Sequence, residues 1–283
     1  MPDYPIKHTR DNPVGYRSPL DRQMKYQEVT LKVDGPSSAQ VAEEPIEGDK
    51  QRQPVAYIPG VDTCIRGWYI YKDPSEAQIK QQNRRLMIFF HENAGNIGLR
   101  LDYFELAYKR LNCDIFVIAY RGYSDSDGVP DEALIKKDMI HLNNYITSQF
   151  KHKYYHAGGI FIVGRSLGGA VGTYLASINE LGAKENYYDH NFNGIVLENT
   201  FTSIDDMVDV IFPFLKYLKW IVLNMHWNTN ALIKDIRSPL LIVVGEKDEI
   251  VPSDHGTRLY DSAVNTVLKD TLYVKDGHHN DTW

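Results

Sequence analysis

The chain has 283 residues, of which 43% are apolar, and it carries a formal net charge of −6 at pH 7. The apolar share is sufficient for a large core, while the scattered basic residues and the negative charge give no indication of nucleic-acid binding. Two cysteines exclude a disulfide framework, and no apolar run reaches the roughly 18 residues that a membrane-spanning helix needs.

Residues 1–25 are rich in proline and have little periodicity, so we expect an extended N-terminal arm. Residues 26–33 and 63–72 hold many β-branched and aromatic side chains, which predicts two strands. Between them, 34–62 contains prolines, glycines and acidic side chains, which indicates a polar surface insertion. The start of the chain lacks the apolar core of a signal peptide, and we therefore expect an intracellular protein.

Short apolar runs then alternate with segments of helical character. Continuous apolar runs are typical of strands buried on both faces, as in a parallel sheet. The runs are 85–91, 114–120, 159–164, 194–199 and 240–245, with a last strand at 271–275. The helical segments are 97–111, 131–150, 167–181 and 253–264. This alternation predicts a doubly wound α/β sheet.

One strand-to-helix junction carries the pattern G-x-S-x-G, from Gly164 to Gly168. A serine at the tip of such a sharp turn has a strained backbone, so its neighbours must be small. The following helix directs its N-terminus and the Leu167 N–H toward the place where negative charge develops. We therefore predict that Ser166 is a nucleophile. A glycine-rich turn that only packs, or that binds phosphate, is the alternative.

A serine hydroxyl needs a base, and the base needs an orienting acid. In folds that carry this kind of serine turn, the catalytic residues follow one another along the chain in the order serine, acid, histidine. We prefer Asp248 as the acid over Glu246 and Glu249, which are interpreted as solvated surface acids. The base follows the last strand, where spacing alone does not choose between His278 and His279. Adjacent histidines rarely ligate one ion, so we expect no metal.

Six motifs together resemble the eukaryotic α/β-hydrolase-domain serine hydrolases, in particular the bud-emergence-type group near the protein depalmitoylase branch. The motifs are HENAGNIGLRLDYF, AYRGYSDSDGVPDE, GRSLGGAV, ENTFTSI, GEKDEIVP and DGHHNDTW. The resemblance runs from about residue 63 to the end of the chain. It implies a central eight-stranded sheet with Ser166 on its nucleophile elbow. We therefore expect a single α/β-hydrolase domain over 1–283, with a mostly parallel sheet, helices on both faces and a small lid.

The resemblance also assigns site residues. The relatives' pattern G-x-H-N-D falls on this chain so that His279 is the base and His278 occupies the variable position. The HENAGN motif matches the oxyanion loop, which implies that the Asn93 N–H is an oxyanion donor together with that of Leu167. His91 is then a structural residue that fixes this loop.

Three features depart from the family pattern. Many relatives have glycine where this chain has Glu92, so the substitution puts an acid near the pocket, where it either faces solvent or repels anionic substrates. A helix usually follows the catalytic histidine, and only four residues follow it here. Relatives often carry a membrane-anchoring segment before the domain. If the protein associates with a membrane through such a segment, we expect that segment to lie outside this chain.

Residues 205–235 are apolar on more than one helical face, with Pro213 near the start. They predict either a helix packed on the sheet or a lid that lines an acyl pocket or touches a membrane surface. Elsewhere we interpret Arg121 as a structural hydrogen-bond donor and Glu198 as a brace for the triad region.

The leading hypothesis is a serine hydrolase that cleaves an ester or thioester of a hydrophobic acyl group, on an acylated protein or a lipid, without a cofactor. A serine peptidase or amidase is an alternative within the same chemistry. An inactive hydrolase-fold subunit that binds a partner is the alternative from another class, favoured by Glu92 and by the abrupt end of the chain. The ordered serine, aspartate and histidine favour an enzyme.

Overall fold

The computed structural model describes residues 8–33, 63–72, 84–111, 113–154, 158–184, 192–211 and 225–283. The insertion expected at 34–62 and the middle of the expected lid lie outside these residues. The chain divides into two compact units, Met1–Phe89 with Ala94–Gly159 and Phe90–Asn93 with Ile160–Trp283. The assignment of the whole chain to one domain stays a prediction.

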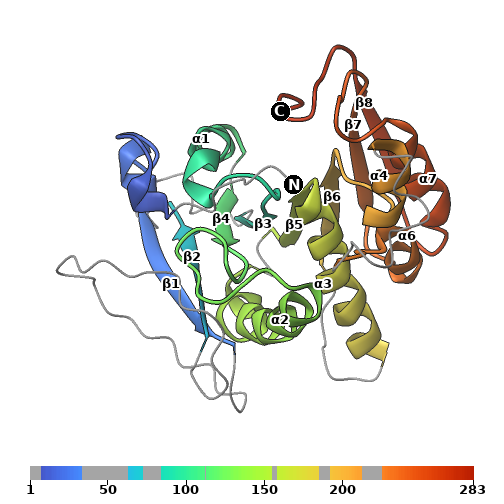
Figure 1. Cartoon of the computed structure of the whole chain (residues 1–283). Coiled ribbons are helices and arrows are strands. Elements are labelled where there is room, and N and C mark those ends of the chain that lie inside the picture. Colours follow the sequence, from blue (N-terminus) through green and yellow to red (C-terminus); the bar gives the residue numbers. More distant parts are fainter. Residues whose placement is uncertain are drawn as a thin grey trace. The chain divides into compact units, whose positions relative to one another are not determined.

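Among its described residues, the first unit has four strands in the order β1-β2-β4-β3 (Figure 1). β1 pairs with β2 and β2 with β4 in antiparallel fashion, whereas β3 and β4 are parallel. Every residue of β4 is buried, as the continuous apolar run predicts. The strands are β1 (Tyr26–Lys32), β2 (Cys64–Ile70), β3 (Arg85–Phe90) and β4 (Cys113–Ile118).

Two helices cover opposite faces of these strands, α1 (Leu101–Arg110), which follows the 3-10 turn η3 (Ile97–Arg100), and α2 (Glu132–Tyr154). Phe89 of β3 packs edge-on against Phe104 of α1, with ring centroids 5.1 Å apart. Phe116 of β4 lies opposite Ile88 in register and packs against Phe150 of α2 at 5.3 Å. Because neighbouring residues of a strand point to opposite faces, Phe89 and Phe116 face different sides. Figure 1 shows α1 and α2 on the two sides of β4.

The described part of the N-terminal arm is not extended throughout, because it forms two 3-10 turns, η1 (Thr9–Asp11) and η2 (Pro19–Arg22). A proline at the first helical position and an acid three residues after Ser18 favour such a turn. The Asp21 carboxylate accepts the Ser18 N–H at 3.1 Å. One of the prolines that indicated an extended arm, Pro19, therefore starts a helical turn.

In the part of the second unit that the structure describes, four strands lie in the order β5-β6-β7-β8, and each neighbouring pair is parallel. β5, β6 and β7 are largely buried, whereas β8 is partly exposed along its length, as expected for an edge strand. The strands are β5 (Ile160–Arg165), β6 (Gly194–Glu198), β7 (Leu240–Gly245) and β8 (Lys269–Val274). All eight strands predicted from the sequence are thus present, with small differences at their ends.

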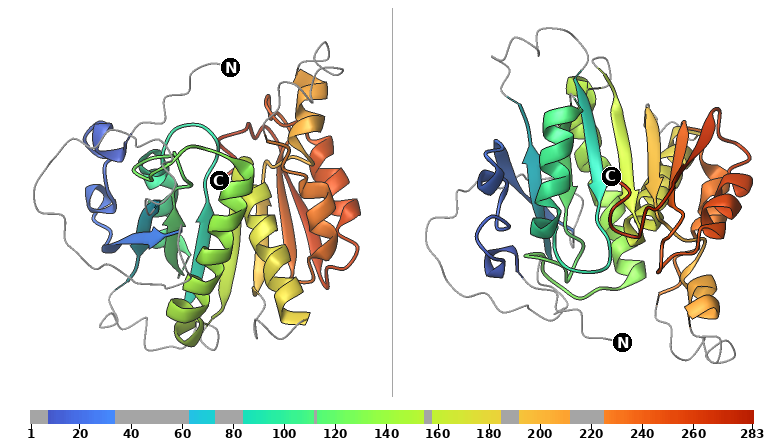
Figure 2. Two further views of the ribbon diagram at one scale, coloured as in Figure 1. Left: turned by 60° about the horizontal axis from the view of Figure 1, so that its bottom comes forward. Right: turned by 90° about the horizontal axis from the view of Figure 1, so that it is seen from above.

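The described helices of this unit are α3 (Leu167–Lys184), α4 (Ile204–Ile211), α6 (Thr229–Leu232) with the 3-10 turn η5 (Ile233–Asp235), and α7 (Asp254–Ser262). α3 packs on β5, α7 packs on β7 and β8, and α6 contacts both helices (Figure 2). The buried indole of Trp227 lies edge-on to Tyr174 of α3, with ring centroids 6.5 Å apart. The candidate site residues lie in the loops that follow the carboxyl ends of these strands.

Candidate active site

Ser166 is the single residue between β5 and α3, and its φ is +51°. Few residues other than glycine adopt this left-handed region. Three hydrogen bonds hold the turn. The Ser166 N–H donates to the Glu198 carbonyl at 2.9 Å, and the Ser166 carbonyl accepts from the Gly169 N–H at 2.9 Å and the Thr200 hydroxyl at 2.7 Å. The surrounding structure therefore fixes the strained backbone.

The glycines of the motif allow the main chain to pack closely around this turn. A Cβ atom on Gly168 would lie 1.9 Å from the Phe90 carbonyl oxygen, at the end of β3. A Cβ atom on Gly164 would lie 2.4 Å from the Gly168 carbonyl oxygen. The opposing groups are backbone atoms, which cannot move aside as a flexible side chain can. The requirement for small neighbours that the sequence indicated is therefore steric.

Asp248 and His279 form a buried pair. Asp248 follows β7, His279 follows β8, and the Asp248 Oδ2 to His279 Nδ1 distance is 2.8 Å. The other carboxylate oxygen, Oδ1, accepts the N–H groups of Ile250 and Val251, each at 2.8 Å. The two side chains are 1% and 6% exposed. Because both carboxylate oxygens are engaged, Asp248 holds the imidazole with Nδ1 turned toward it and leaves Nε2 for another partner.

The neighbouring histidine has a different environment. His278 Nδ1 lies 3.2 Å from Glu249 Oε2, and these side chains are 52% and 59% exposed. The pKa of the Glu249 carboxyl is lowered by a hydrogen bond from its own main-chain N–H, with a further contribution from His278. Glu246 is also exposed, as predicted. Of the two histidines between which spacing does not choose, His279 and not His278 contacts Asp248.

Leu167 and Asn93, the predicted oxyanion donors, both belong to the second unit. Leu167 is the first residue of α3, and the N–H groups of the first helical turn have no acceptor within their own helix. Asn93 is exposed in the short segment after β3. The His91 ring is 1% exposed, and its Nδ1 lies 2.7 Å from the Glu92 carbonyl oxygen, which fits a structural role in this loop.

Glu92 neither faces solvent nor stands free in a pocket, in contrast to the two expectations from the sequence. Its carboxylate is buried and lies 3.1 Å from Arg165, the residue before the candidate nucleophile. On its other side the Arg165 guanidinium pairs with Glu198 at 2.9 Å. Glu198 also accepts the Thr282 hydroxyl, and the Trp283 ring lies 5.8 Å from the guanidinium carbon. Arg165 therefore links the loop after β3, the serine turn and the end of the chain.

The sequence alone does not reveal the role of Arg165, although it contains one signal. A charged side chain that directly follows a buried strand must find an opposite charge, because an unpaired buried ion is costly. The charge alone does not identify its partners, because Glu92 and Glu198 are distant in sequence. The interpretation of Glu198 as a brace agrees with its contact to Arg165.

Arg121, in the first unit, is fully buried. Its Nε donates to Asp138 Oδ2 at 2.7 Å, and a second nitrogen contacts the other carboxylate oxygen. This bidentate pair confirms the interpretation of Arg121 as a structural donor.

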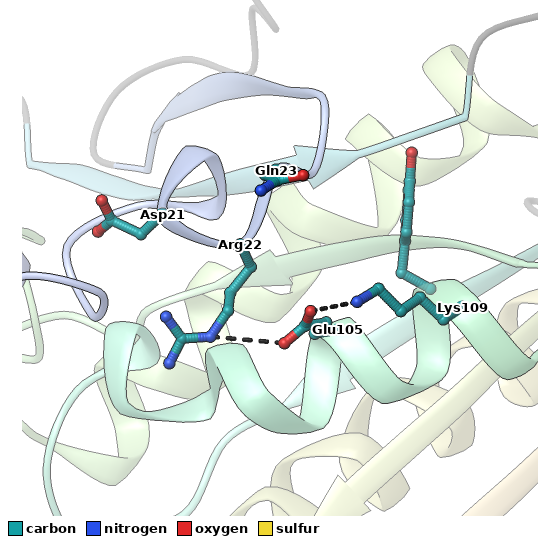
Figure 3. Close-up of a pocket in the computed structure, with 6 residues that line it drawn as sticks. Asp21, Arg22, Gln23, Glu105 and Lys109 are labelled. Atoms are coloured by element: carbon teal, nitrogen blue, oxygen red, sulfur yellow. Dashed lines mark hydrogen bonds and ion pairs between the residues drawn. The ribbon is translucent and has the colours of Figure 1, made fainter.

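A shallow hollow of about 260 Å³ lies in the first unit between the arm and α1 (Figure 3). Three of its charged side chains face one another, with Arg22 3.5 Å from Glu105 and Lys109 2.5 Å from the same carboxylate. Arg22 also pairs with Asp102 at 2.8 Å. We assign it no ligand, because its charges compensate one another. Its lining residues are Asp21, Arg22, Gln23, Glu105, Tyr108 and Lys109.

The expected lid at 205–235 is only partly described. α4 covers its beginning, and α6 with η5 covers its end, while 212–224, including Pro213, lies outside the described residues. Trp227 belongs to the core and not to a surface, since its side chain is fully buried. The lid therefore stays a prediction.

Two further properties concern only the described ranges. Within them, no three histidine, cysteine or acidic side chains gather where a metal ion could be held. In the same part of the chain, no helix combines the length and the apolar character that crossing a bilayer would require.

Comparison with known proteins identifies a family. The sequence pattern described as "Serine hydrolase (FSH1)" matches residues 126–280, which is more than half of the chain. The chain is 35% identical to the α/β hydrolase domain-containing protein WAV2 of Arabidopsis thaliana, over 70% of this chain and 64% of that protein. It is 34% identical to protein bem46 of Schizosaccharomyces pombe, over 71% and 63%. The chain thus spans less than two thirds of the length of these two relatives.

Solved structures show the same fold at low sequence identity. An α/β hydrolase of Vibrio vulnificus aligns with a TM-score of 0.62 at 17% identity, over 91% of this chain and 76% of that chain. An esterase of Pyrococcus furiosus aligns with a TM-score of 0.60 at 14% identity, over 93% and 86%. The resemblance and the fold class expected from the sequence are confirmed. The chain belongs to the serine hydrolase family described as FSH1 and has the α/β-hydrolase fold.

Proposed function

We propose that the chain is a serine hydrolase that cleaves an ester or thioester of a hydrophobic acyl group. The observation that carries this proposal is the buried contact of 2.8 Å between Asp248 and His279, in the same compact unit as a serine held at φ +51°. The serine hydrolase family supports the general chemistry. The acyl substrate and the role of each residue are our inference.

In the proposed reaction, Ser166 Oγ attacks the acyl carbonyl carbon while His279 Nε2 takes the hydroxyl proton. Asp248 orients the ring and stabilises the imidazolium, and the Asn93 and Leu167 N–H groups donate to the oxyanion. When the C–O or C–S bond breaks, His279 gives its proton to the leaving oxygen or sulfur. Water then attacks the acyl-enzyme with His279 as base, which releases the acid and restores the serine hydroxyl.

The proposed substrate class, an acylated protein or a lipid, has two supports. The sequence resembles the group near the protein depalmitoylases, and segment 205–235 is apolar on several faces. A relative from Saccharomyces cerevisiae, 32% identical over 72% of this chain, bears the name "Uncharacterized membrane protein YNL320W". We accordingly propose an intracellular enzyme that makes peripheral contact with a membrane.

Labelling by a fluorophosphonate probe tests the triad directly, because the probe reacts with a serine that is activated as a nucleophile. We expect the wild-type protein to be labelled, and Ser166→Ala and His279→Ala to lose the labelling. His278→Ala is the matched control, because it removes the adjacent, exposed imidazole and should label at the wild-type rate. On an ester substrate Ser166→Ala should lower kcat by about 10⁴- to 10⁶-fold, as in other serine hydrolases.

Two outcomes would overturn the assignment. Folded wild-type protein that takes up no probe would support an inactive subunit that binds a partner. A Ser166→Ala protein that keeps more than about a tenth of the activity would place the nucleophile elsewhere.

A matched set of substrates tests the leaving group. We expect esters and thioesters of one acyl group to be hydrolysed, with kcat/KM rising with acyl length, and the corresponding amide to react far more slowly. An amide turned over as fast as the ester would favour the peptidase alternative.

A further inference from the structure

Asn199, the residue directly after β6, makes an unusual set of contacts. Its φ is +47°, in the left-handed region that asparagine tolerates better than most side chains, and it is 4% exposed. Its main-chain N–H donates to the Val243 carbonyl of β7 at 3.0 Å. The backbone therefore directs the carboxamide toward the loops that follow β7 and β8.

Both ends of this carboxamide are used. The Asn199 Oδ1 accepts the Gly245 N–H at 2.8 Å, at the point where β7 ends and the loop with Asp248 begins. The Nδ2 group donates to the carbonyl oxygens of His279 at 3.0 Å and His278 at 3.2 Å. One buried side chain therefore connects the segment before the candidate acid with the residue that carries the candidate base.

The residues on either side of Asn199 hold the serine turn. The Glu198 carbonyl accepts the Ser166 N–H, and the Thr200 hydroxyl donates to the Ser166 carbonyl. Residues 198–200 thus bind the backbone of Ser166, the start of the loop that carries Asp248, and the backbone of His279. Asn199 is the member of this segment whose side chain reaches the acid and base loops.

We propose that Asn199 is a positioning residue that holds the loops of Asp248 and His279 in the register their contact requires. Asn199 is not a member of the triad, and its role rests on the proposed function. Misplacing a catalytic group by about 1 Å can lower a rate on the order of 100-fold, so a side chain that fixes two loops affects the reaction without touching the substrate.

Two substitutions test the role. Asn199→Asp keeps the shape and the acceptor for the Gly245 N–H, but it replaces the donor to the two carbonyls with a repelling oxygen. Asn199→Gly keeps a residue suited to positive φ and removes the whole bridge. We expect each to lower kcat and the rate of probe labelling by about 10- to 100-fold, with KM changed less than about threefold.

Asn193→Asp is the matched control. Asn193 precedes β6 at the opposite end of that strand, and its side-chain oxygen accepts the Ile160 N–H at 2.9 Å. An aspartate there keeps the acceptor, far along the strand from the candidate site. This variant should label at the wild-type rate.

A double-mutant cycle with His279→Ala distinguishes positioning from general damage. If Asn199 acts through His279, adding Asn199→Asp to His279→Ala should leave the residual activity unchanged. An equal fall in both backgrounds would overturn the proposal, as would wild-type rates in both Asn199 variants or loss of folding in both. If instead His279→Ala itself labels normally, the proposed function fails, and that result is distinct from a failure at Asn199.

Discussion

Arg165 is a cation held between two carboxylates, Glu92 and Glu198, and all three side chains are at most 5% exposed. Such a group stabilises the fold only while its charges are matched, because removing one partner leaves an uncompensated buried charge. The guanidinium is the shared member, so the consequences of its loss differ from those of losing one carboxylate.

We expect Arg165→Met to lower the free energy of unfolding by about 3–5 kcal/mol, because two buried carboxylates then face each other without a cation. Glu92→Gln should cost less, about 1–2 kcal/mol, since Glu198 still pairs with the guanidinium. Urea unfolding measures both. Arg237→Met, which removes an exposed arginine of the same unit, should change the value by less than about 0.5 kcal/mol. An Arg165→Met protein as stable as Glu92→Gln would contradict this account.

At the scale of the element, α7 depends on a buried histidine near its start. His255 is fully buried, and its Nδ1 accepts the Thr202 N–H at 3.2 Å and lies 2.8 Å from the Thr202 hydroxyl. Burial lowers the pKa of His255 below its ordinary value of 6.5, and Arg258 lowers it further. The acids Asp254, Asp206 and Asp248 act in the opposite direction without outweighing the burial. Folding therefore favours the neutral form of this ring.

Because folding lowers the pKa of His255, the free energy of unfolding falls as the pH falls. The unfolded chain takes up a proton on His255 near pH 6.5, whereas the folded chain does so only at lower pH. The stabilising contribution is complete above about pH 6.5 and is lost as the pH falls toward the folded pKa, by at most about 1.4 kcal/mol per pH unit. Urea unfolding at pH 7.5, 6.0 and 5.0 should show a shallower loss for His255→Gln than for wild type. His278→Gln is the control and should follow the wild-type profile. If the free energy of unfolding fell equally with pH in all three proteins, the pH dependence would not come from His255.

At the scale of the whole molecule, the candidate catalytic residues and a second buried polar network belong to different compact units. In the first unit, the Asp114 carboxylate is 1% exposed, lies 2.5 Å from Arg84, and accepts the hydroxyls of Tyr69 and Tyr154. Burial raises the pKa of the Tyr154 hydroxyl, which keeps it a hydrogen-bond donor. This network stabilises the fold and includes none of the residues proposed for catalysis.

Stability and activity should therefore respond separately to substitution. Tyr154→Phe keeps the ring but removes a donor to Asp114, and we expect a loss of about 1–3 kcal/mol in the free energy of unfolding. The rate of probe labelling at a temperature where the protein remains folded should stay within about twofold of wild type, since Ser166, Asp248 and His279 are unchanged. A tenfold fall in that rate for fully folded protein would show that the network also serves the active site.

The sequence predicted the strands more completely than the contacts between side chains. Each buried strand appears as a continuous apolar run, so a local pattern was enough to locate it. The serine turn was equally readable, because Gly164 and Gly168 are local consequences of close packing. The relatives' pattern G-x-H-N-D pointed to His279, but its contact with Asp248, like the pairing of Glu92 with Arg165, joins residues far apart in the chain, which local patterns do not encode. Asn199 lies within the ENTFTSI motif, yet its contact with Gly245 follows only from the neighbouring positions of β6 and β7.

The left-handed backbone at position 166 limits which nucleophiles evolution or engineering could install there. Threonine offers the same hydroxyl, but its branched Cβ is poorly compatible with positive φ. Cysteine shares the unbranched geometry of serine and would fit. At position 166 the positive φ restricts which nucleophilic side chains are possible, independently of how reactive they are.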